Sequence, residues 1–545
     1  MSSSKKKQLR KEQYMTERQS AAAQEAKKLK RYTMTFWVVI ALVACIFIGA
    51  VISNPIKHAV YKNTTAMTVG DHKLSSVDVN YFFVDAVSKY VNDYSSYISL
   101  IMDVTKPLNE QYINTENQTT WADSFLTSAT STIKSTYALY DLAVKNGHAL
   151  TDAEKSSIDS QIATYSLYAV YYGYADIDAY LCNLYGYGAS EASYRNYLEV
   201  STMANSYLAA YSDSLEYTED QMNTYYENDP FRFTSYTFAV YYVNASSYLE
   251  GGTKDEKGNT VYSDEEKAKA VQNAKLAAEM LISNSYESVD YFDVAIKAMP
   301  INASNANAAS TKYEDALYEE INSLFHDWLT GKVEGSEEAT YVARAEGDMT
   351  IIPYVTGTGD SEVTNGYYVA RFESSNDNNF AMKNVRHLLV AFEGGTTNST
   401  TGVTTYTDEE KDKAQDEAER LLAGWVAAGD LSEESFAELA KKNSDDNAAA
   451  GGLYEDIYPG QMVAAFEDWC YDPARQVGDY EIIATDYGYH IMFFVGDSDT
   501  TFLQFMLNNA MRNEEVENWH NELVEAVVVN TLTTKHILMD MVLSH

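Results

Sequence analysis

The sequence predicts an α+β protein of several domains: an N-terminal transmembrane helix, a helical domain, two related α+β domains and a C-terminal helix. Three observations predict this architecture. A chain of 545 residues is too long for one hydrophobic core. The uncharged run Thr33–Ser53 has 21 residues, enough to cross a bilayer as one helix. The phrase YSDEEKAKA at residue 262 returns as YTDEEKDKA at residue 406, which indicates an internal duplication.

The N-terminal region has the charge pattern of a membrane anchor. Residues 1–31 hold ten Lys or Arg and three Glu, a local charge of +7, and four of the basic residues stand just before the apolar run. The positive-inside rule then predicts a basic cytoplasmic tail at 1–31, a transmembrane anchor at 32–53 and the remainder outside the membrane. An alternative stays open, because Leu42–Cys45 resembles a lipobox, and a lipoprotein would carry its lipid on Cys45.

The rest of the chain is strongly acidic. The whole sequence has a formal charge of −39, so the part after the basic tail carries −46. Such a surface repels phosphates and argues against nucleic acid as a partner. The three cysteines, Cys45, Cys182 and Cys470, cannot form a disulfide framework, although a single Cys182–Cys470 bridge stays open. The sequence lacks CxxC and zinc-like His/Cys spacing, so it predicts no metal and no cofactor.

Residues 65–228 predict a helical domain. Thr68–Phe83 reads as a short strand, a turn at Gly70 and then a helix capped at Ser75 or Ser76. Beyond it, apolar and tyrosine residues recur at three- and four-residue spacing, which is typical of amphipathic helices. Two interpretations of the many tyrosines are open. They are core and rim residues of these helices, which we favour, or they form a sticky cradle for unfolded chains.

The duplicated phrase belongs to two longer units with the same order of motifs. The first unit, 229–378, opens with FRFTSYTFAVYYV and ends with GYYVARF. The second unit, 384–497, opens with VRHLLVAFEGG and ends with GYHIMFF. Each pattern predicts a strand, two helices, a strand and a final strand, and therefore an α+β domain. The last stretch, 500–545, contains one more amphipathic helix at Glu514–Val528.

The second unit resembles the parvulin family of peptidyl-prolyl isomerases along nearly all of Asn384–Asp497. VRHLLV is similar to the family's opening strand with its buried histidine. SFAELAKKNSDD precedes the Gly-rich turn in AAAGGLYEDIYPGQMVAAFEDW, and TDYGYHIMFF is similar to the closing strand with a second histidine. The resemblance implies the parvulin fold and activity on proline-containing peptides.

Matching these motifs residue by residue implies roles for eight positions. The implied catalytic positions are His387, Asp446, Thr485 and His490. The implied substrate-binding positions are Leu453, Met462, Phe466 and Tyr487, and the first three of them would form the proline pocket. The sequence departs from the family at Tyr487, where some members have Ser, and at Tyr454, where the family often has Gly.

The chemistry of prolyl isomerisation agrees with these residue types. Rotation about an Xaa-Pro bond loses amide resonance and faces a barrier of ~18–20 kcal/mol. No bond breaks, so the reaction requires no nucleophile, metal or cofactor. A dry pocket for the proline ring and a polar environment that favours the twisted amide are the two requirements. The apolar residues of the set suit the first requirement, and the histidines, Asp446 and Thr485 suit the second.

The first unit lacks these functional residues. It has no histidine in Phe231–Glu250, and Tyr368 stands where the second unit has His490. KAMPINASNA (297–306) offers neither Asp nor Cys at the place of Asp446, and the Gly-Gly-Leu turn is absent. We therefore expect this degenerate unit to be catalytically silent and to act as a spacer or a peptide-binding module.

The overall layout is similar to that of the PrsA/SurA class of extracytoplasmic foldases. In that class the terminal helix packs on the N-terminal region, which groups 500–545 with 65–228. The resemblance implies an isomerase and foldase at a bacterial cell membrane that acts on unfolded or partly folded secreted proteins. Two alternatives stay open: a holdase chaperone whose second unit binds peptide with little turnover, and an adhesive surface protein built on inert parvulin folds. The oligomeric state is not predicted.

Overall fold

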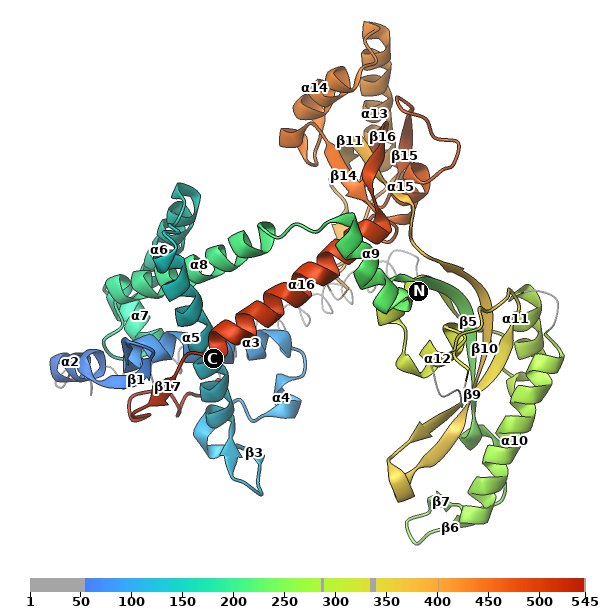
Figure 1. The fold of residues 1–545 in the computed structure, drawn as a ribbon, viewed down its shortest axis with the longest axis horizontal. Helices are drawn as coiled ribbons and strands as arrows, with labels where there is room; N and C mark the ends of the chain where they lie inside the picture. The colour runs from blue at the N-terminus through green and yellow to red at the C-terminus, as the bar shows by residue number, and fades with distance from the viewer. Residues whose placement is uncertain (1–53, 286–288, 334–339, 400, 544–545) are drawn as a thin grey trace, which may run out of the picture. The chain divides into compact units, whose positions relative to one another are not determined.

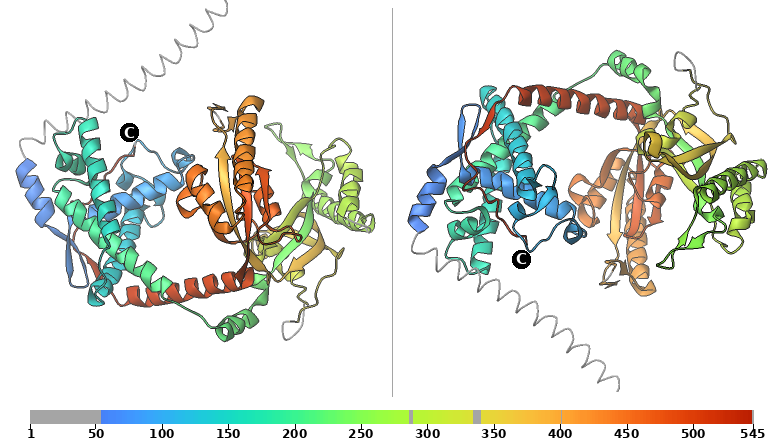
Figure 2. Two further views of the ribbon diagram at one scale, coloured as in Figure 1. Left: turned by 90° about the horizontal axis from the view of Figure 1, so that it is seen from above. Right: turned by 90° about the horizontal axis from the view of Figure 1, so that it is seen from below.

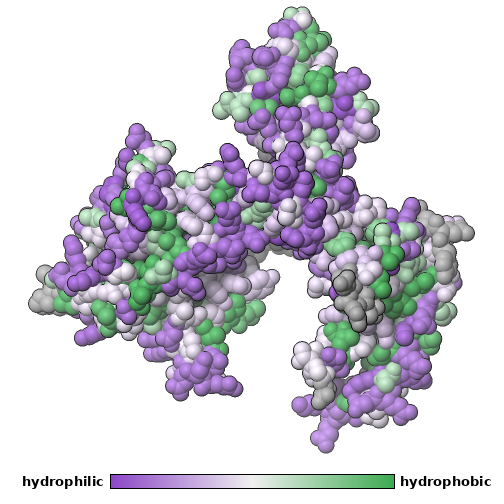
Figure 3. Space-filling model, viewed as in Figure 1, coloured by the Kyte–Doolittle hydropathy of each residue, from purple (hydrophilic) through white to green (hydrophobic). Residues whose placement is uncertain are grey.

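The computed structural model describes residues 54–285, 289–333, 340–399 and 401–543 (Figure 1). The predicted tail and anchor therefore lie outside the described residues. Within the described residues, no helix has both the length and the apolar character needed to span a membrane. Contacts divide the chain into two units: Met1–Leu215 with Arg512–His545, and Glu216–Met511. On the face shown in Figure 3 hydrophilic residues predominate, in keeping with the high charge.

The first unit begins with a β-hairpin that leads into a buried helix. Strands β1 (Thr65–Val69) and β2 (His72–Ser75) pair antiparallel around a turn whose Gly70 has a φ of +52°. Helix α3 (Ser76–Asp93) follows, and Ser75 caps it: the Ser75 hydroxyl accepts from the backbone N–H of the third helical residue. The predicted strand, turn and capped helix are thus confirmed.

The remainder of the first unit is mainly helical. Its helices and short strands are α2 (Asn54–Asn63), α4 (Ile98–Ile101), β3 (Tyr112–Asn114), β4 (Thr119–Thr120), α5 (Trp121–Lys145), α6 (Asp152–Tyr171), α7 (Ile177–Tyr185) and α8 (Glu191–Asp213). Hydroxyl caps at Thr120, Thr151 and Ser190 begin three of them. Several tyrosines form part of the core, where the rings of Tyr81, Tyr185 and Tyr194 are buried and pack together. For these tyrosines the core interpretation is the correct one.

The C-terminal helix is longer than predicted. Helix α16 (Phe502–Glu525) begins 12 residues before the expected start at Glu514, because Phe502 and Leu507 are buried and extend its apolar side. Residues from Arg512 onward belong with the first unit. There the Trp519 ring stacks on Tyr211 at 3.9 Å, and strand β17 (Val529–Thr531) pairs with β1.

The second unit contains helix α9 (Glu219–Asn228) and two domains of the same topology (Figures 1 and 2). The first domain comprises β5 (Ser235–Asn244), α10 (Asp264–Ser283), α11 (Val289–Ala298), β8 (Thr311–Leu317), α12 (His326–Leu329), β9 (Met349–Thr356) and β10 (Val363–Asn376). The second comprises β11 (Ala381–Ala391), α13 (Asp408–Ala428), α14 (Glu433–Asn443), β14 (Leu453–Ile457), α15 (Ala464–Cys470), β15 (Tyr480–Ala484) and β16 (Gly488–Thr501).

The two sheets are equivalent strand by strand. Their orders are β8-β5-β10-β9 and β14-β11-β16-β15, so the opening and closing strands lie side by side at the centre of each sheet. The sequence pattern did not predict α12 and β9 in the first domain or α15 and β15 in the second. It also did not predict the small hairpin of each domain, β6 (Thr253–Lys254) with β7 (Thr260–Val261) and β12 (Thr396–Thr397) with β13 (Thr404–Thr405). The internal duplication is therefore a duplication of structure.

The repeated acidic phrase has a structural explanation. In each domain a hydroxyl caps the long helix, Ser263 for α10 and Thr407 for α13. One oxygen of Glu266 or Glu410 closes this cap, and the other oxygen accepts the N–H of Gly252 or Gly395, at 2.9 Å in both domains. The phrase and the preceding Glu-Gly-Gly therefore form one joint between the strand and the helix, which both domains retain.

Candidate active site

Two histidines lie on one face of the central strands in the second domain. His387 on β11 and His490 on β16 are buried, with 2% and 5% of their surfaces exposed. Strand pairing sets Met492 opposite His387, and Leu389 opposite His490. Residues on alternate positions face the other side, where helices α13 and α14 cover the sheet around Leu388, Phe436 and other apolar residues.

The two imidazoles form a hydrogen-bonded pair with Thr485. The Nδ1 atoms of His387 and His490 lie 3.0 Å apart. His490 Nε2 lies 2.9 Å from the hydroxyl of Thr485, which is in the loop between β15 and β16. The structure thus brings together three of the predicted catalytic residues.

Asp446 completes this row of polar groups. Its Oδ2 lies 3.4 Å from His387 Nε2, which is buried and has no hydrogen-bond partner in the described structure. The hydroxyl of Tyr454 donates to the same carboxylate oxygen at 3.1 Å. Ser444 shapes the loop, since its hydroxyl accepts the N–H groups of Leu389 and Asp446.

The carboxylate fixes the direction of the proton chain. An N–H on His387 Nε2 faces Asp446 favourably, whereas a lone pair there would face a negative charge. His387 Nδ1 is then the acceptor, His490 Nδ1 carries a proton, and His490 Nε2 accepts from Thr485. The Thr485 hydroxyl also lies 3.4 Å from the carbonyl of Gly488, so His490 Nε2, at 2.9 Å, is the nearer acceptor for its proton. Every group in the row then has a consistent donor or acceptor role.

Burial keeps both imidazoles neutral. It lowers the pKa of His387 to about 4, against a weaker opposing effect of Asp446, and it lowers the pKa of His490 to about 4, assisted by His387. As the pH falls from about 6.5 to about 4, the unfolded chain takes up protons that the folded pair does not accept, so the free energy of unfolding decreases in this window.

We therefore expect neither imidazole to titrate above pH 5 and isomerase activity to stay level between pH 6 and 8, because the pKa of each group lies near 4. An NMR titration of the imidazole carbon-bound protons would measure both values directly. A midpoint above pH 6 for His387 or His490 would contradict the neutral chain.

Apolar residues pack beside the histidines at the positions that the resemblance assigns to the proline pocket. The Phe466 ring meets the rings of His387 and His490 edge to face, with centroids at 5.3 Å and 5.7 Å. Met462 is partly buried against the same cluster, but it precedes helix α15 instead of lying on it. Its position therefore comes from the Pro459–Gln461 turn and not from helical spacing. Tyr487 is 63% exposed and lies at the rim, where only its backbone N–H contacts Thr485.

The strand register places Tyr454, and not Leu453, on the face of the sheet that carries His387, so the assignment of Leu453 to the pocket stays a prediction. In the pairing of β14 with β11, Leu453 lies opposite Arg386 and Tyr454 lies opposite Val385. Directly opposed residues point to the same face, so Tyr454 shares the face of His387 and Leu453 faces the other side. A one-residue difference in register exchanged the two side chains.

Gly452 allows the turn to pass close to the histidine strand. Its φ is +68°, and a Cβ at this position would lie 1.9 Å from the carbonyl oxygen of His387. In return, the N–H of His387 donates to the carbonyl of Gly452 at 2.9 Å. The second glycine of the Gly-Gly-Leu turn is thus required by the site itself.

The first domain keeps an equivalent aromatic contact without the polar row. Strand pairing sets Val240 at the place of His387 and Tyr368 at the place of His490. Phe325 contacts Tyr368 edge to face at 5.3 Å, much as Phe466 contacts His490. Apolar packing has therefore replaced the imidazole pair, in agreement with the expectation of a degenerate unit.

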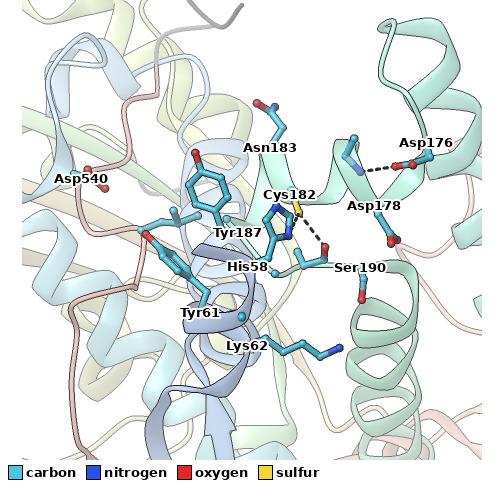
Figure 4. Close-up of a pocket in the computed structure, with 16 residues that line it drawn as sticks. His58, Tyr61, Lys62, Asp176, Asp178, Cys182, Asn183, Tyr187, Ser190 and Asp540 are labelled. Atoms are coloured by element: carbon cyan, nitrogen blue, oxygen red, sulfur yellow. Dashed lines mark hydrogen bonds between the residues drawn. The ribbon is translucent and has the colours of Figure 1, made fainter. Parts of the chain in front are cut away.

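A separate pocket in the first unit lacks comparable chemistry (Figure 4). Cys182 lies 3.9 Å from His58 Nδ1, but its thiol donates to the carbonyl of Ala189 at 3.0 Å. Burial raises the pKa of this thiol, so the group is neutral and a weak nucleophile. Cys182 and Cys470 are both free thiols, and the described residues contain no cluster of metal ligands.

Comparison of the sequence with models of known protein families gives one match. Residues 367–496 match the family model of the PPIC-type PPIase domain. No curated protein matches the sequence. Similar solved structures include a peptidylprolyl isomerase, PrsA, from Bacillus anthracis, with 18% identity over 28% of this chain and 59% of that one, and a TM-score of 0.17.

Two further solved structures are similar in part. The peptidyl-prolyl isomerase ESS1 from Candida albicans has 27% identity over 21% of this chain and 63% of that one, with a TM-score of 0.16. PrsA from Bacillus cereus has 17% identity over 51% of this chain and 90% of that one, with a TM-score of 0.19. The chain covers less than two thirds of the length of the first two structures.

The family match and the site agree on the same part of the chain. The matched residues span the second domain's strands and helices from β11 through most of β16, and they include the histidine pair, Asp446, Thr485, Met462 and Phe466. The second domain, β11 to β16, is therefore a parvulin-type PPIase domain of the PPIC class.

Proposed function

We propose that this protein is a foldase that isomerises Xaa-Pro bonds in unfolded or partly folded secreted polypeptides outside a membrane, with residues 33–53 as its anchor. The observation that carries the catalytic part is the row of Thr485, His490, His387 and Asp446, with the two histidines buried, beside Phe466 and Met462. The basic tail, the apolar run and the acidic remainder of the sequence support the location.

The site favours the twisted amide over the planar one. In the planar amide, resonance places negative charge on the carbonyl oxygen, and rotation removes part of it. A carboxylate beside that oxygen therefore destabilises the planar state relative to the twisted one. Asp446 supplies this charge at the mouth of the pocket, where its side chain is 44% exposed. The apolar wall holds the proline ring while the preceding residue rotates.

The neutral imidazole pair serves as a rigid support for Asp446. Because both rings are buried and hydrogen-bonded to each other, His387 presents a fixed N–H toward the carboxylate. A protonated pair would neutralise the negative charge of Asp446, which disfavours the planar amide relative to the twisted one. The mechanism needs no covalent intermediate, because only the amide torsion changes.

Refolding of a secreted model protein whose slow phase is limited by proline isomerisation tests the foldase proposal. We expect the full-length protein in detergent to accelerate that phase at catalytic concentration. The location is tested separately by protease treatment of intact bacteria that carry the protein. An intact chain after protease treatment, with lysed cells as the positive control, would overturn the extracytoplasmic placement.

A holdase remains the second candidate function, and one feature of the first domain favours it. A cavity of about 640 Å³ between α10 and α11 is lined by uncharged residues, among them Leu276, Met280 and Val294. Flexible methionine and aliphatic side chains suit varied apolar segments. Suppressed aggregation of a client without a faster proline-limited phase would favour this function over the foldase.

We expect all isomerase activity to reside in the second domain. In the full-length protein, His490→Ala should remove most of the activity, because the first domain has Tyr368 and Val240 at the histidine positions. Tyr368→Ala in the first domain is the matched control and should leave the rate of peptide isomerisation within twofold of wild type. If the rate falls with Tyr368→Ala and is unchanged by His490→Ala, catalysis resides in the first domain and the expectation is wrong.

A further inference from the structure

We infer that Tyr454 is a positioning residue for Asp446 and that its ring is a specificity-determining wall of the proline pocket. The inference deepens the proposed isomerase function and depends on it. The sequence motifs implied no role for Tyr454, and the residue departs from the family pattern at this position. Three features of the described structure support the assignment.

The first feature is the face on which the ring lies. Tyr454 stands opposite Val385 on β11, so its side chain points toward the histidine face of the sheet. Its ring centroid lies 5.0 Å from that of His387 at an interplanar angle of 58°. The ring also packs against the cluster that contains Phe466 and Met462. A proline ring in the pocket therefore meets an aromatic surface on this side.

The second feature is the hydroxyl group. The Tyr454 hydroxyl donates to Asp446 Oδ2 at 3.1 Å, on the same oxygen that faces His387 Nε2 at 3.4 Å. Burial and the nearby carboxylate raise the pKa of Tyr454, so the phenol stays protonated and acts as a donor. Apart from the longer contact with His387, no other side chain among the described residues donates a hydrogen bond to the Asp446 carboxylate.

The third feature is the attachment of the loop to the strand. The side-chain amide of Asn447 donates to the carbonyl of Leu453 at 2.8 Å, which ties the Asp446 loop to β14 next to Tyr454. Ser444 fixes the backbone of the loop, whereas Tyr454 fixes the carboxylate itself. Without the phenol, the partly exposed carboxylate is free to rotate away from His387 into solvent.

Two substitutions separate the hydroxyl from the ring. Tyr454→Phe keeps the wall and removes the donor, so we expect kcat to fall about 3- to 10-fold with KM within twofold of wild type. Tyr454→Ala also removes the wall, so KM should rise as well. Tyr489→Phe is the matched control: its hydroxyl bonds to Gln415 at 3.2 Å on the other face of the sheet, and its loss should change neither constant.

The experiment combines exchange NMR of an Xaa-Pro peptide at several concentrations with ¹⁵N spectra of the imidazoles. The proposal predicts a fall in kcat for Tyr454→Phe that Tyr489→Phe does not show, and a change in the His387 Nε2 signal. Equal kcat for wild type and Tyr454→Phe, or equal losses for both Tyr→Phe variants, would overturn it. An inactive wild-type protein would instead contradict the proposed function. In that case the positioning role is tested by the spectra alone: a His387 Nε2 signal that is the same in wild type and Tyr454→Phe would reject it.

Discussion

Replacing Asp446 by Asn is expected to lower the rate of peptide isomerisation about 10- to 100-fold, because the change removes one charge at the reacting amide. Asn has nearly the same shape and keeps an oxygen that can accept from Tyr454. The pocket wall is untouched, so peptide affinity should change little. Exchange NMR gives the rate, and peptide titration gives the affinity.

The neighbouring carboxylate is the matched control for this substitution. Asp445 accepts the N–H of Ala391 at 2.9 Å, and no contact with the histidine pair is described for it. Asp445→Asn keeps an acceptor for that N–H and should leave the rate within twofold. Equal rates for Asp446→Asn and wild type would show that the charge of Asp446 is not part of catalysis.

The second large effect is expected from Gly452→Ala. The new Cβ would lie 1.9 Å from the carbonyl oxygen of His387 in a backbone conformation with a φ of +68°. The turn must therefore move away from β11, which breaks the hydrogen bond from the His387 N–H to the Gly452 carbonyl. We expect a loss of about 3 kcal/mol in the free energy of unfolding and a disturbed site. Urea unfolding of the purified protein measures it.

Gly429→Ala is the control that separates the steric clash of a Cβ with His387 from the cost of a left-handed backbone. Gly429 ends helix α13 with a φ of +79°, and a Cβ there would meet no atom within 4 Å. Its loss should be limited to the left-handed backbone penalty of about 1 kcal/mol. If Gly452→Ala costs no more than Gly429→Ala, the close approach of the turn to His387 is not a constraint on the site.

The site residues were predicted through the resemblance to the parvulin motifs, and the structure brings four of them together. His387 and His490 lie in the two central strands of the sheet, Thr485 lies in the loop between β15 and β16, and Asp446 lies in the loop after α14. The repeated order of motifs was enough to predict two copies of one fold. The repeated acidic phrase itself marks a shared structural joint, so the catalytic difference between the copies had to be found elsewhere.

The exchange of Leu453 and Tyr454 could not be predicted from the sequence pattern. Strand β14 has an irregular register, and Asp456 within it has a φ of +55°. In such a strand the alternation of faces cannot be counted from one end, and a single step moves every side chain to the other face. An apolar residue was assigned to an apolar pocket, whereas the backbone presents the tyrosine.

The extents of the helices were missed for a related reason. The start of α16 depends on Phe502, whose ring stacks on Tyr458 at 5.0 Å, a contact between residues far apart in the sequence. Helix α15 is a single short helix of seven residues, so it offers too few turns for a periodic pattern. Tertiary packing, which local spacing does not encode, sets both boundaries.

Exchange NMR on a panel of Xaa-Pro peptides, without a coupling protease, tests the central claim most directly. The purified protein should accelerate cis–trans exchange at substoichiometric concentration, and His490→Ala, which removes the ring that bonds to both Thr485 and His387, should lose most of that acceleration. Peptide line broadening without faster exchange, or acceleration that survives His490→Ala, would contradict the account.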